Sequence, residues 1–364
     1  MKKAWMFYPE NDIALAVGKE RFTAPKHAAE LRRCCSALLG WVAEDGDAVI
    51  TEGDGEWLED ALRVVGKRLS ANVADAEAAC PWGWSASSRL MLMRQGIDER
   101  LLPSAEAVAE MREMSHRRIS IAINEGLRVK GLDAPESPRE ITHFDQLDLS
   151  RRWMIKSPWS CSGRGVVDSS SVSERTLRER VEGVMRKQGS VMAEPYLREL
   201  RPFAMLFNVE GGKARYIGLS LFENNAAGAY VGNVVASQAV LLEEMSGYVS
   251  ESYLDALSKG LEDVLTEEVG GKYEGYCGVD MMVYDDNGAM RVAPCVELNL
   301  RMTMGTVALL LAEKVLAEGK RGVMSMLPSA DERVPEFADG RLVGGTLALT
   351  PAGRRFQFKL MCLP

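Results

Sequence analysis

The sequence is poor in histidine, with only three in 364 residues, and His27, His116 and His143 lie far apart. A zinc site built from histidine is therefore disfavoured, because such sites draw on several closely placed ligands. The seven cysteines include no Cys-x-x-Cys pair and are odd in number. This pattern favours reduced thiols in a cytoplasm, most of them serving as small buried apolar side chains.

Long apolar runs are also missing. The longest notable run, Val307–Ala312, is far shorter than the roughly 20 residues that cross a bilayer. Near the beginning, Pro9–Asp12 interrupts the apolar residues too early for a signal peptide. The formal net charge is −8, and no Lys/Arg block is long enough to follow a nucleic-acid backbone. We therefore expect a cytoplasmic protein that binds neither a membrane nor nucleic acid.

Two common nucleotide-binding signatures are absent as well. No Gly-Lys pair is followed by Ser or Thr, which excludes a Walker loop. No G-x-G-x-x-G follows a strand, which excludes a dinucleotide fingerprint. An acidic protein of this kind can still bind an anionic nucleotide, but it must do so with a few placed cations.

The length of the chain predicts two or three domains. The first hundred residues alternate short strands, Ala4–Tyr8 and Ala48–Thr51, with amphipathic helices, Ala28–Leu39 and Glu56–Val65. This rhythm indicates a small parallel sheet. Ser104 is the expected N-cap of the next helix. We place the domain boundaries at 1–104, 105–194 and 195–364, with an α/β first domain and α+β organisation in the other two.

From residue 150 onward the sequence predicts a series of strands, loops and helices. They are a strand at Trp153–Lys156, a loop at Ser160–Gly165, a helix from Ser171–Glu174 to near Gly189, a strand at Val191–Ala193, a hairpin of Phe203–Val209 and Ala214–Phe222, and a helix at Tyr253–Val264.

A pair of apolar segments late in the chain is the most informative feature of the sequence. Asp280–Tyr284 and Val296–Arg301 flank the dipeptide Asn287-Gly288, the strongest short-range signal for a β-hairpin. With these two residues as the loop, Asp286 pairs with Ala289.

The register of this hairpin gathers polar side chains on one face. Counting back from the turn puts Asp280 opposite Cys295 and diagonal to Glu297, with Cβ atoms roughly 7–8 Å apart. Glu297 and Asn299 share a face because side chains alternate along a strand. Pro294 cannot donate to the ladder and can bulge the strand, so the register depends on it.

Two carboxylates and a carboxamide on one face form a site of hard oxygen ligands suited to Mg²⁺, and Arg301 adds a fixed cation for phosphate. The alternative is a half-exposed hairpin whose polar face meets water, and we adopt it for Asp285 and Asp286 beside the turn. Glu297 and Asn299 lie instead in an apolar sequence, where charged groups are usually paired or bound. The hairpin therefore favours a metal–phosphate site.

A second feature is Lys156, at the end of a predicted strand and before the loop Ser160–Gly165. A lysine there can hold a phosphate as a compact point charge, and a Ser- and Gly-rich backbone can approach an anion closely. The alternative is an ordinary turn with a solvated lysine, which is the better reading for an isolated lysine and loop.

Taken in order, these parts resemble the ATP-grasp superfamily. They are a Lys-ended strand with a Ser/Gly loop, a strand ending in Glu194-Pro195-Tyr196-Leu197, and an Asp-bearing strand paired with Glu297-x-Asn299-x-Arg301. The similarity extends from Ser115 to Leu311. It implies an α+β ATP-grasp fold, in which two subdomains clasp ATP, preceded by a small α/β domain.

The resemblance also implies a nucleotide site. Lys156 would bind the α- and β-phosphates of ATP. Main-chain groups of Tyr196 and Leu197 would bind adenine, and Glu194 would recognise its amino group. The mobile lid over the triphosphate would include Ser160, Ser162, Gly163, Arg164 and Gly165.

The same resemblance implies that Asp280, Glu297 and Asn299 hold one or two Mg²⁺ ions and that Arg301 neutralises charge on the transferred phosphoryl group. Lys156 and Arg301 are thus the expected catalytic residues.

The sequence departs from the family pattern in three places, one of which is that Asp280 and Glu297 lie further apart in sequence than in many members. Where the family has an earlier phosphate-binding lysine, this chain has Arg117 and Arg118; we list Arg118 as the candidate and leave Arg117 as the alternative. The expected position of an acidic ribose ligand holds Arg201, with Glu199 nearby but out of register, so the ribose contact stays open.

The implied activity is that of an ATP-dependent carboxylate–amine ligase with small-molecule substrates. The substrates' identity and the oligomeric state stay open, a homodimer included. The alternatives are a kinase that stops after phosphate transfer, a nucleotide-binding module without turnover, and a scaffold that binds no nucleotide.

Three further features are weaker candidates. Asn11 and Asp12 follow the first strand, where open α/β sheets place ligands. For His116 we expect a structural or solvated role, and for Pro81–Trp84 a packed loop.

Overall fold

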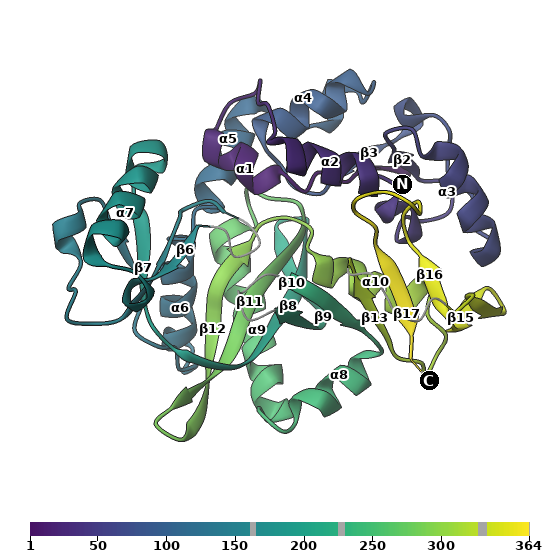
Figure 1. The fold of residues 1–364 in the computed structure, drawn as a ribbon. Helices are drawn as coiled ribbons and strands as arrows, with labels where there is room; N and C mark the ends of the chain where they lie inside the picture. Colours follow the sequence, from purple (N-terminus) through teal and green to yellow (C-terminus); the bar gives the residue numbers. More distant parts are fainter. Residues whose placement is uncertain (161–164, 225–229, 327–332, 364) are drawn as a thin grey trace.

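The computed structural model describes residues 1–160, 165–224, 230–326 and 333–363 of the chain. Figure 1 shows a large central β-sheet, with the small N-terminal sheet above it and a smaller sheet to its left. The remaining pair of strands, β14 (Glu336–Ala338) and β15 (Arg341–Gly344), forms a short antiparallel ribbon.

The first sheet is the parallel sheet predicted from the strand–helix rhythm. Its order is β2-β1-β3, with β1 parallel to both neighbours. The carboxyl ends of all three strands therefore lie at one edge. The elements of this region are β1 (Lys3–Met6), β2 (Ala48–Ile50), β3 (Ala78–Pro81), α1 (Asn11–Val17), α2 (Lys26–Cys35), α3 (Gly55–Leu62) and α4 (Ala86–Arg94).

The small sheet on the other side of the molecule is antiparallel, with the order β4-β7-β5-β6. Its strands are β4 (Arg139–Ile141), β5 (Trp153–Lys156), β6 (Val166–Asp168) and β7 (Val191–Pro195), and α7 (Glu174–Gln188) covers it. The predicted strand at Trp153–Lys156 and the helix end at Gly189 are confirmed. The N-cap of α7 is Ser173, whose hydroxyl accepts the Thr176 N–H.

The central sheet has eight strands in the order β12-β11-β8-β9-β10-β13-β17-β16. These strands are β8 (Arg198–Glu210), β9 (Lys213–Asn224), β10 (Tyr230–Val235), β11 (Gly275–Asp286), β12 (Ala289–Asn299), β13 (Gly322–Ser325), β16 (Thr346–Ala348) and β17 (Lys359–Cys362). The helices nearby are α5 (Ala105–Met114), α6 (Ile119–Val129), α8 (Gln238–Met245), α9 (Glu251–Val269) and α10 (Met304–Lys314).

Alternation along the central strands gives the sheet two packed faces. On β8, Phe203 and Met205 lie in a core shared with α6, α8 and α9, whereas Ala204 and Leu206 face α10 and its Leu309. Asp280 pairs with Ala204 and so lies on the α10 side of the sheet.

The C-terminal strands tie the N-terminal sheet to the central one. Trp5 and Trp41 of the N-terminal region share one core with Leu311 of α10 and Leu360 of β17. The indole N–H of Trp41 also donates to the Leu349 carbonyl at 2.9 Å. These contacts hold the N-terminal region against α10 and the C-terminal strands.

The β11–β12 hairpin has the predicted turn but not the whole predicted register. Asp286 pairs with Ala289, as expected, and the pairing continues to Met282 and Ala293. Asp280 then pairs with Glu297, so the prediction of Cys295 as its partner is wrong.

A bulge between these pairs explains the difference. Between these two pairs β12 contains three residues, including Pro294, whereas β11 contains only one. Pro294 has no N–H for the ladder, and the Cys295 carbonyl accepts instead from the buried Asn124 side chain of α6 at 3.0 Å. Because the insertion amounts to two residues, the alternation of faces is preserved.

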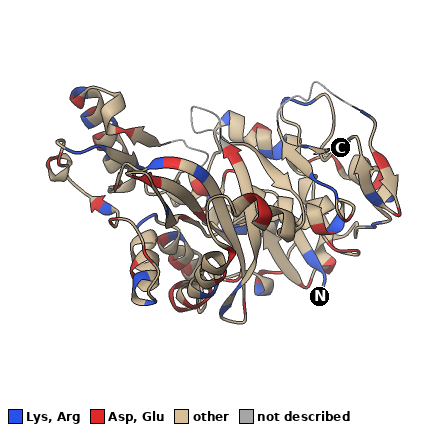
Figure 2. Ribbon diagram, turned by 90° about the horizontal axis from the view of Figure 1, so that it is seen from below, with Lys and Arg blue, Asp and Glu red and all other residues tan. Residues whose placement is uncertain are grey.

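Charged residues of both signs are interspersed over the surface (Figure 2). Many of them form ion pairs between neighbouring elements, such as Lys130 with Asp263 and Arg198 with Asp285. No helix in the part of the chain that the structure describes is long and apolar enough to cross a bilayer.

We predict that α6 is anchored through its buried face. Ile123 is fully buried against α9 and the central sheet, so Ile123→Ala should lower the free energy of unfolding by about 2–5 kcal/mol. Val129→Ala, in the same helix but 88% exposed, is the matched control and should change it by less than about 0.5 kcal/mol. Urea denaturation measures both, and equal losses would contradict the packing.

Candidate functional site

The centre of the site is a pair of carboxylates on adjacent strands. Asp280 on β11 and Glu297 on β12 are directly opposite, and directly paired residues point to the same face with Cβ atoms roughly 4.5–5.5 Å apart. The side-chain amide of Asn299 donates to Asp280 Oδ2 at 2.9 Å. Burial and the nearby charge of Glu297 raise the pKa of Asp280 to about 7. Two carboxylates kept this close need a cation or a proton between them.

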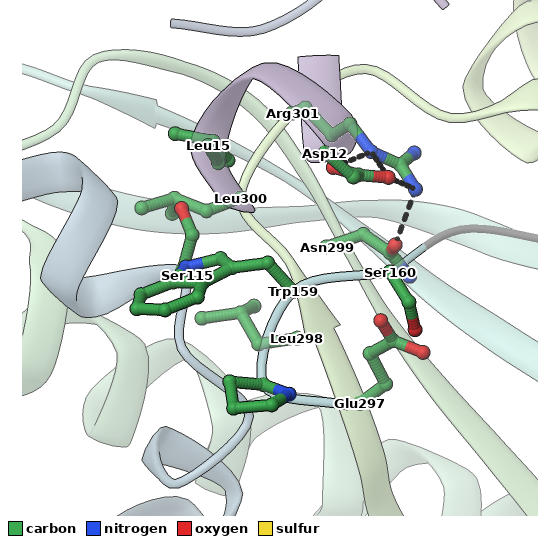
Figure 3. A pocket seen from close by; sticks show the side chains of 11 residues that line it. Asp12, Leu15, Ser115, Trp159, Ser160, Glu297, Leu298, Asn299, Leu300 and Arg301 are labelled. Atoms are coloured by element: carbon green, nitrogen blue, oxygen red, sulfur yellow. Dashed lines mark hydrogen bonds and ion pairs between the residues drawn. The ribbon is translucent and has the colours of Figure 1, made fainter. Parts of the chain in front are cut away.

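Arg301 lies at the end of the same row of side chains, as Figure 3 shows. Its Nε is 3.0 Å from each oxygen of Asp12, and its Nη2 is 2.8 Å from Asp12 Oδ2. On the other side, Nη2 donates to Asn299 Oδ1 at 2.7 Å. A guanidinium held by two partners in this way has a fixed plane and position.

Arg117 supplies a second cation at the carboxylate pair. Its Nη1 lies 2.6 Å from Glu297 Oε2, and the side chain is only 7% exposed. Its other nitrogens donate to the Ser157 carbonyl at 3.0 Å and to the Ser160 hydroxyl at 3.2 Å. Arg117 therefore joins the carboxylate pair to the segment that leads into the predicted lid.

Arg118, the residue predicted to contact a phosphate, points elsewhere. It pairs with Glu113 at 2.7 Å and with Glu140 at 3.4 Å, and its side chain is 43% exposed. The structure thus brings Arg117, and not Arg118, to Glu297.

Lys156 lies at the end of β5 and is almost fully buried. Its ammonium forms an ion pair with Glu194 Oε2 at 2.5 Å. Met154 of β5 pairs with Glu194 of β7, so the two partners are diagonal neighbours on one face of the small sheet. Two of the predicted nucleotide-site residues are therefore in contact.

The segment predicted as the lid begins and ends in a narrow hairpin neck. Ser157 N–H donates to the Gly165 carbonyl at 2.9 Å. Gly165 has φ +80°, and a Cβ there would lie 2.6 Å from the Ser157 hydroxyl, so glycine is required for the close approach. Ser160 also lines the cavity next to Glu297. Ser162, Gly163 and Arg164 lie outside the described residues.

The predicted hinge connects β7 to β8 and thus the small sheet to the central one. Tyr196 N–H donates to the Arg152 carbonyl at 3.2 Å, and the Arg152 guanidinium lies 3.4 Å from the centre of the Tyr196 ring. Leu197 is half-buried beside it. Just past the hinge, burial raises the pKa of Glu199 while the charge of Lys156 lowers it, which links Glu199 electrostatically to the same region.

His116 has a structural role in this arrangement. It is buried against Trp159, and its Nδ1 accepts the Arg118 N–H at 3.0 Å. Burial and nearby Arg118 lower the pKa of His116 to about 4, so the ring is neutral at physiological pH. Trp82 and Gly83 form a packed loop against the end of β12, where Trp82 O accepts the Met302 N–H.

The donor set fits magnesium better than a metal that needs a full protein cage. Among the described residues, no group of three or more His, Cys, Asp or Glu side chains could surround an ion. Mg²⁺ instead binds through one or two carboxylates and keeps waters or phosphate oxygens as its other ligands. The repulsion between Asp280 and Glu297 is the feature that a divalent cation would relieve.

Sequence reasoning missed the contacts that join distant segments. Asp12 was a weak candidate on its own, and nothing in the sequence linked it to Arg301, 289 residues away. Ser115 and Trp159 line the same cavity as Glu297 and carry no motif that would mark them. For these residues a single sequence holds no signal.

No protein-family model and no curated relative matches the chain. Among solved structures it is similar to biotin carboxylase from Campylobacter jejuni, in complex with β-γ-ATP, with a TM-score of 0.51 and 12% identity, covering 100% of this chain and 87% of that one. It is also similar to the biotin carboxylase domain dimer of 2-oxoglutarate carboxylase from Hydrogenobacter thermophilus, in complex with MgADP, ADP and bicarbonate. There the TM-score is 0.51 and the identity 14%, covering 100% of this chain and 86% of that one. The chain therefore has the ATP-grasp fold, and the predicted fold class is confirmed.

We predict that Asp280→Asn stabilises the ligand-free protein. Between pH 4 and 7 native Asp280, with a pKa of about 7, holds a proton that the unfolded chain has released, so this group costs stability as the pH rises through that window. Asn cannot ionise. The free energy of unfolding of the variant should therefore exceed that of the wild type by at least about 1 kcal/mol at pH 8, and by less at pH 5.

Thermal unfolding at the two pH values measures this difference. Asp286→Asn, near the turn of the same hairpin, is the control and should show no such gain. A lower stability of Asp280→Asn at pH 8 would contradict the raised pKa of Asp280.

Proposed function

We propose that this protein is an Mg²⁺-dependent ATP-dependent ligase that joins a small-molecule carboxylate to an amine. The observation that carries the proposal is the direct pairing of Asp280 with Glu297, flanked by Asn299 and Arg301, in an ATP-grasp fold. Solved structures of this fold contain an ATP analogue or MgADP, which supports a nucleotide at the corresponding place.

In this proposal the nucleotide lies between the small sheet and the central sheet. Lys156 turns from Glu194 to the α- and β-phosphates, and Glu194 becomes available for the adenine amino group. Tyr196 and Leu197 contact the base through their main chain, and Ser160 and Gly165 flank the lid.

Asp280, Glu297 and Asn299 would hold Mg²⁺, which supplies a positive charge that offsets negative charge on the phosphates. Arg117 would take the place of the family's earlier lysine, because its guanidinium reaches Glu297 and the neck of the lid. This assignment replaces Arg118, which pairs with Glu113 and Glu140 instead.

The proposed reaction proceeds in two steps. A carboxylate oxygen of the substrate attacks the γ-phosphorus in line, the bond to the β–γ bridging oxygen breaks, and ADP leaves. The amine then attacks the carbonyl carbon of the acyl phosphate, loses a proton and displaces inorganic phosphate. Arg301, Arg117 and Lys156 orient the phosphates and offset their charge, and the closed lid keeps water from the acyl phosphate.

The test is a screen for ADP release from Mg-ATP with pairs of carboxylates and amines. A ligase releases ADP and phosphate in proportion to the amide formed and needs both substrates. Phosphorylated product without an amine would establish a kinase instead. ATP binding without turnover in any mixture would indicate a binding module, and no thermal shift with Mg-ATP would end the proposal.

We predict that Glu297→Gln lowers Mg-dependent turnover at least about 100-fold, because it removes a ligand charge at nearly constant volume. Steady-state ADP release measures this loss, with Glu251→Gln at the start of α9 as a control of equal chemistry. Wild-type turnover in Glu297→Gln would remove this residue from the mechanism.

A second prediction separates the two adjacent arginines. Arg117→Gln should weaken ATP binding about tenfold or more, since a buried charge at the phosphates is lost. Arg118→Gln is the matched control and should leave ATP affinity within about twofold, because its guanidinium pairs with Glu113 and Glu140 and not with Glu297. Calorimetric titration with ATP decides between them, and the reverse order would restore Arg118 as the phosphate ligand.

A further inference from the structure

Arg301 is built into the contact between the N-terminal sheet and the central sheet. The Met302 N–H donates to the Trp82 carbonyl at 2.7 Å, and Gly83 forms an antiparallel bridge with Arg301. A Cβ at Gly83 would lie 2.6 Å from Asn11 Nδ2 and 2.9 Å from the Arg301 Cβ. The loop after β3 therefore approaches the end of β12 as closely as a backbone can.

The side chain of Arg301 is held by the same region. Asp12, in the first turn of α1, accepts from Nε and Nη2 of the guanidinium. Asn299 accepts from Nη2 with its carbonyl oxygen and donates with its amide nitrogen to Asp280. A continuous polar chain thus runs from Asp12 through Arg301 and Asn299 to Asp280, with its Asp12–Arg301–Asn299 part visible in Figure 3.

We infer that Asp12 is a positioning residue that sets the charge balance of the site: its carboxylate offsets Arg301, so that the Asp280–Glu297 pair attracts a divalent cation. This inference rests on the proposed function for the location of Mg²⁺ and of the phosphates. It goes beyond that function because it gives the N-terminal domain a role in metal affinity without any contact to the metal.

The physical reason lies in the count of charges around the pair. Asp12, Asp280 and Glu297 face the guanidiniums of Arg117 and Arg301. When Asp280 and Glu297 are both ionised, as around a bound cation, negative charge exceeds positive charge as long as Asp12 is present. Without it the signs balance, so the attraction for a cation falls and the attraction of Arg301 for an anion rises. The two effects have opposite signs, which a loss of structure cannot produce.

The experiment uses the full chain and Asp12→Asn, which removes the charge and keeps the shape. Two binding constants are measured by calorimetry: that of metal-free tripolyphosphate, and that of Mg²⁺ for protein saturated with ADP. We expect Asp12→Asn to weaken Mg²⁺ binding roughly 3- to 30-fold and to tighten tripolyphosphate binding by a factor in the same range. Weakening of both ligands, or a change in neither, would overturn the inference.

Two further variants test charge against geometry. Asp12→Glu keeps the charge and should leave both constants within about twofold of wild type; a result like that of Asp12→Asn would overturn the inference. The double variant Asp12→Asn/Arg301→Gln removes both charges and should return Mg²⁺ binding toward the wild-type value. The double variant also provides the test if Asp12→Asn alone does not fold. Mg²⁺ binding that stays weak in the double variant would contradict the charge argument.

The matched control is Asp285→Asn on β11. Asp285 holds the Nε and Nη2 of Arg198 in the same way and is similarly buried, with 18% of its side chain exposed against 13% for Asp12. It should change neither constant. A wild-type protein that binds neither tripolyphosphate nor Mg-ADP would refute the proposed function itself, whereas normal wild-type binding with an unchanged Asp12→Asn refutes only the inference.

Discussion

The site depends on two like charges held face to face on neighbouring strands. Asp280 and Glu297 cannot separate, because the alternate residues of the same strands, Val279 and Leu298, are locked in the core under α9. Moving either carboxylate away would expose part of that core to water, at about 25 cal/mol for each Å² of apolar surface. Hydrophobic packing on one face thus sustains an unfavourable charge arrangement on the other, a pattern typical of binding sites.

The cations around this pair are all paired with carboxylates of this chain. Arg117 pairs with Glu297, Arg301 with Asp12, and Lys156 with Glu194. An unpaired charge in such a half-buried place would carry a large desolvation cost, and each of these cations is therefore paired with a carboxylate. Under the proposed function, binding of a metal and a triphosphate would exchange these ion-pair partners for new ones, and the measured affinity would be the difference between the two sets of ion pairs.

Local signals in the sequence predicted the elements of the site but not their assembly. The Asn287-Gly288 turn and the alternation along β12 put Glu297 on the correct face, because both depend only on neighbours in the chain. The direct pairing with Asp280 was missed, since the bulge at Pro294 is completed by Asn124 from a remote helix. Arg117 and Arg118 are adjacent and chemically identical, so only tertiary structure separates them.

Under the proposed function, we expect residues at the carboxyl edge of the N-terminal sheet to select the substrate. Four of the buried side-chain atoms without a hydrogen-bond partner among the described residues belong to Glu10, Asn11 and Asp54. All three residues follow the carboxyl ends of β1 and β2, the edge at which open parallel sheets bind ligands. Buried polar atoms are costly unless something satisfies them. Because Asp12 at this edge also holds Arg301, a substrate bound there would, under the proposed function, lie next to the residue that offsets charge on the phosphoryl group.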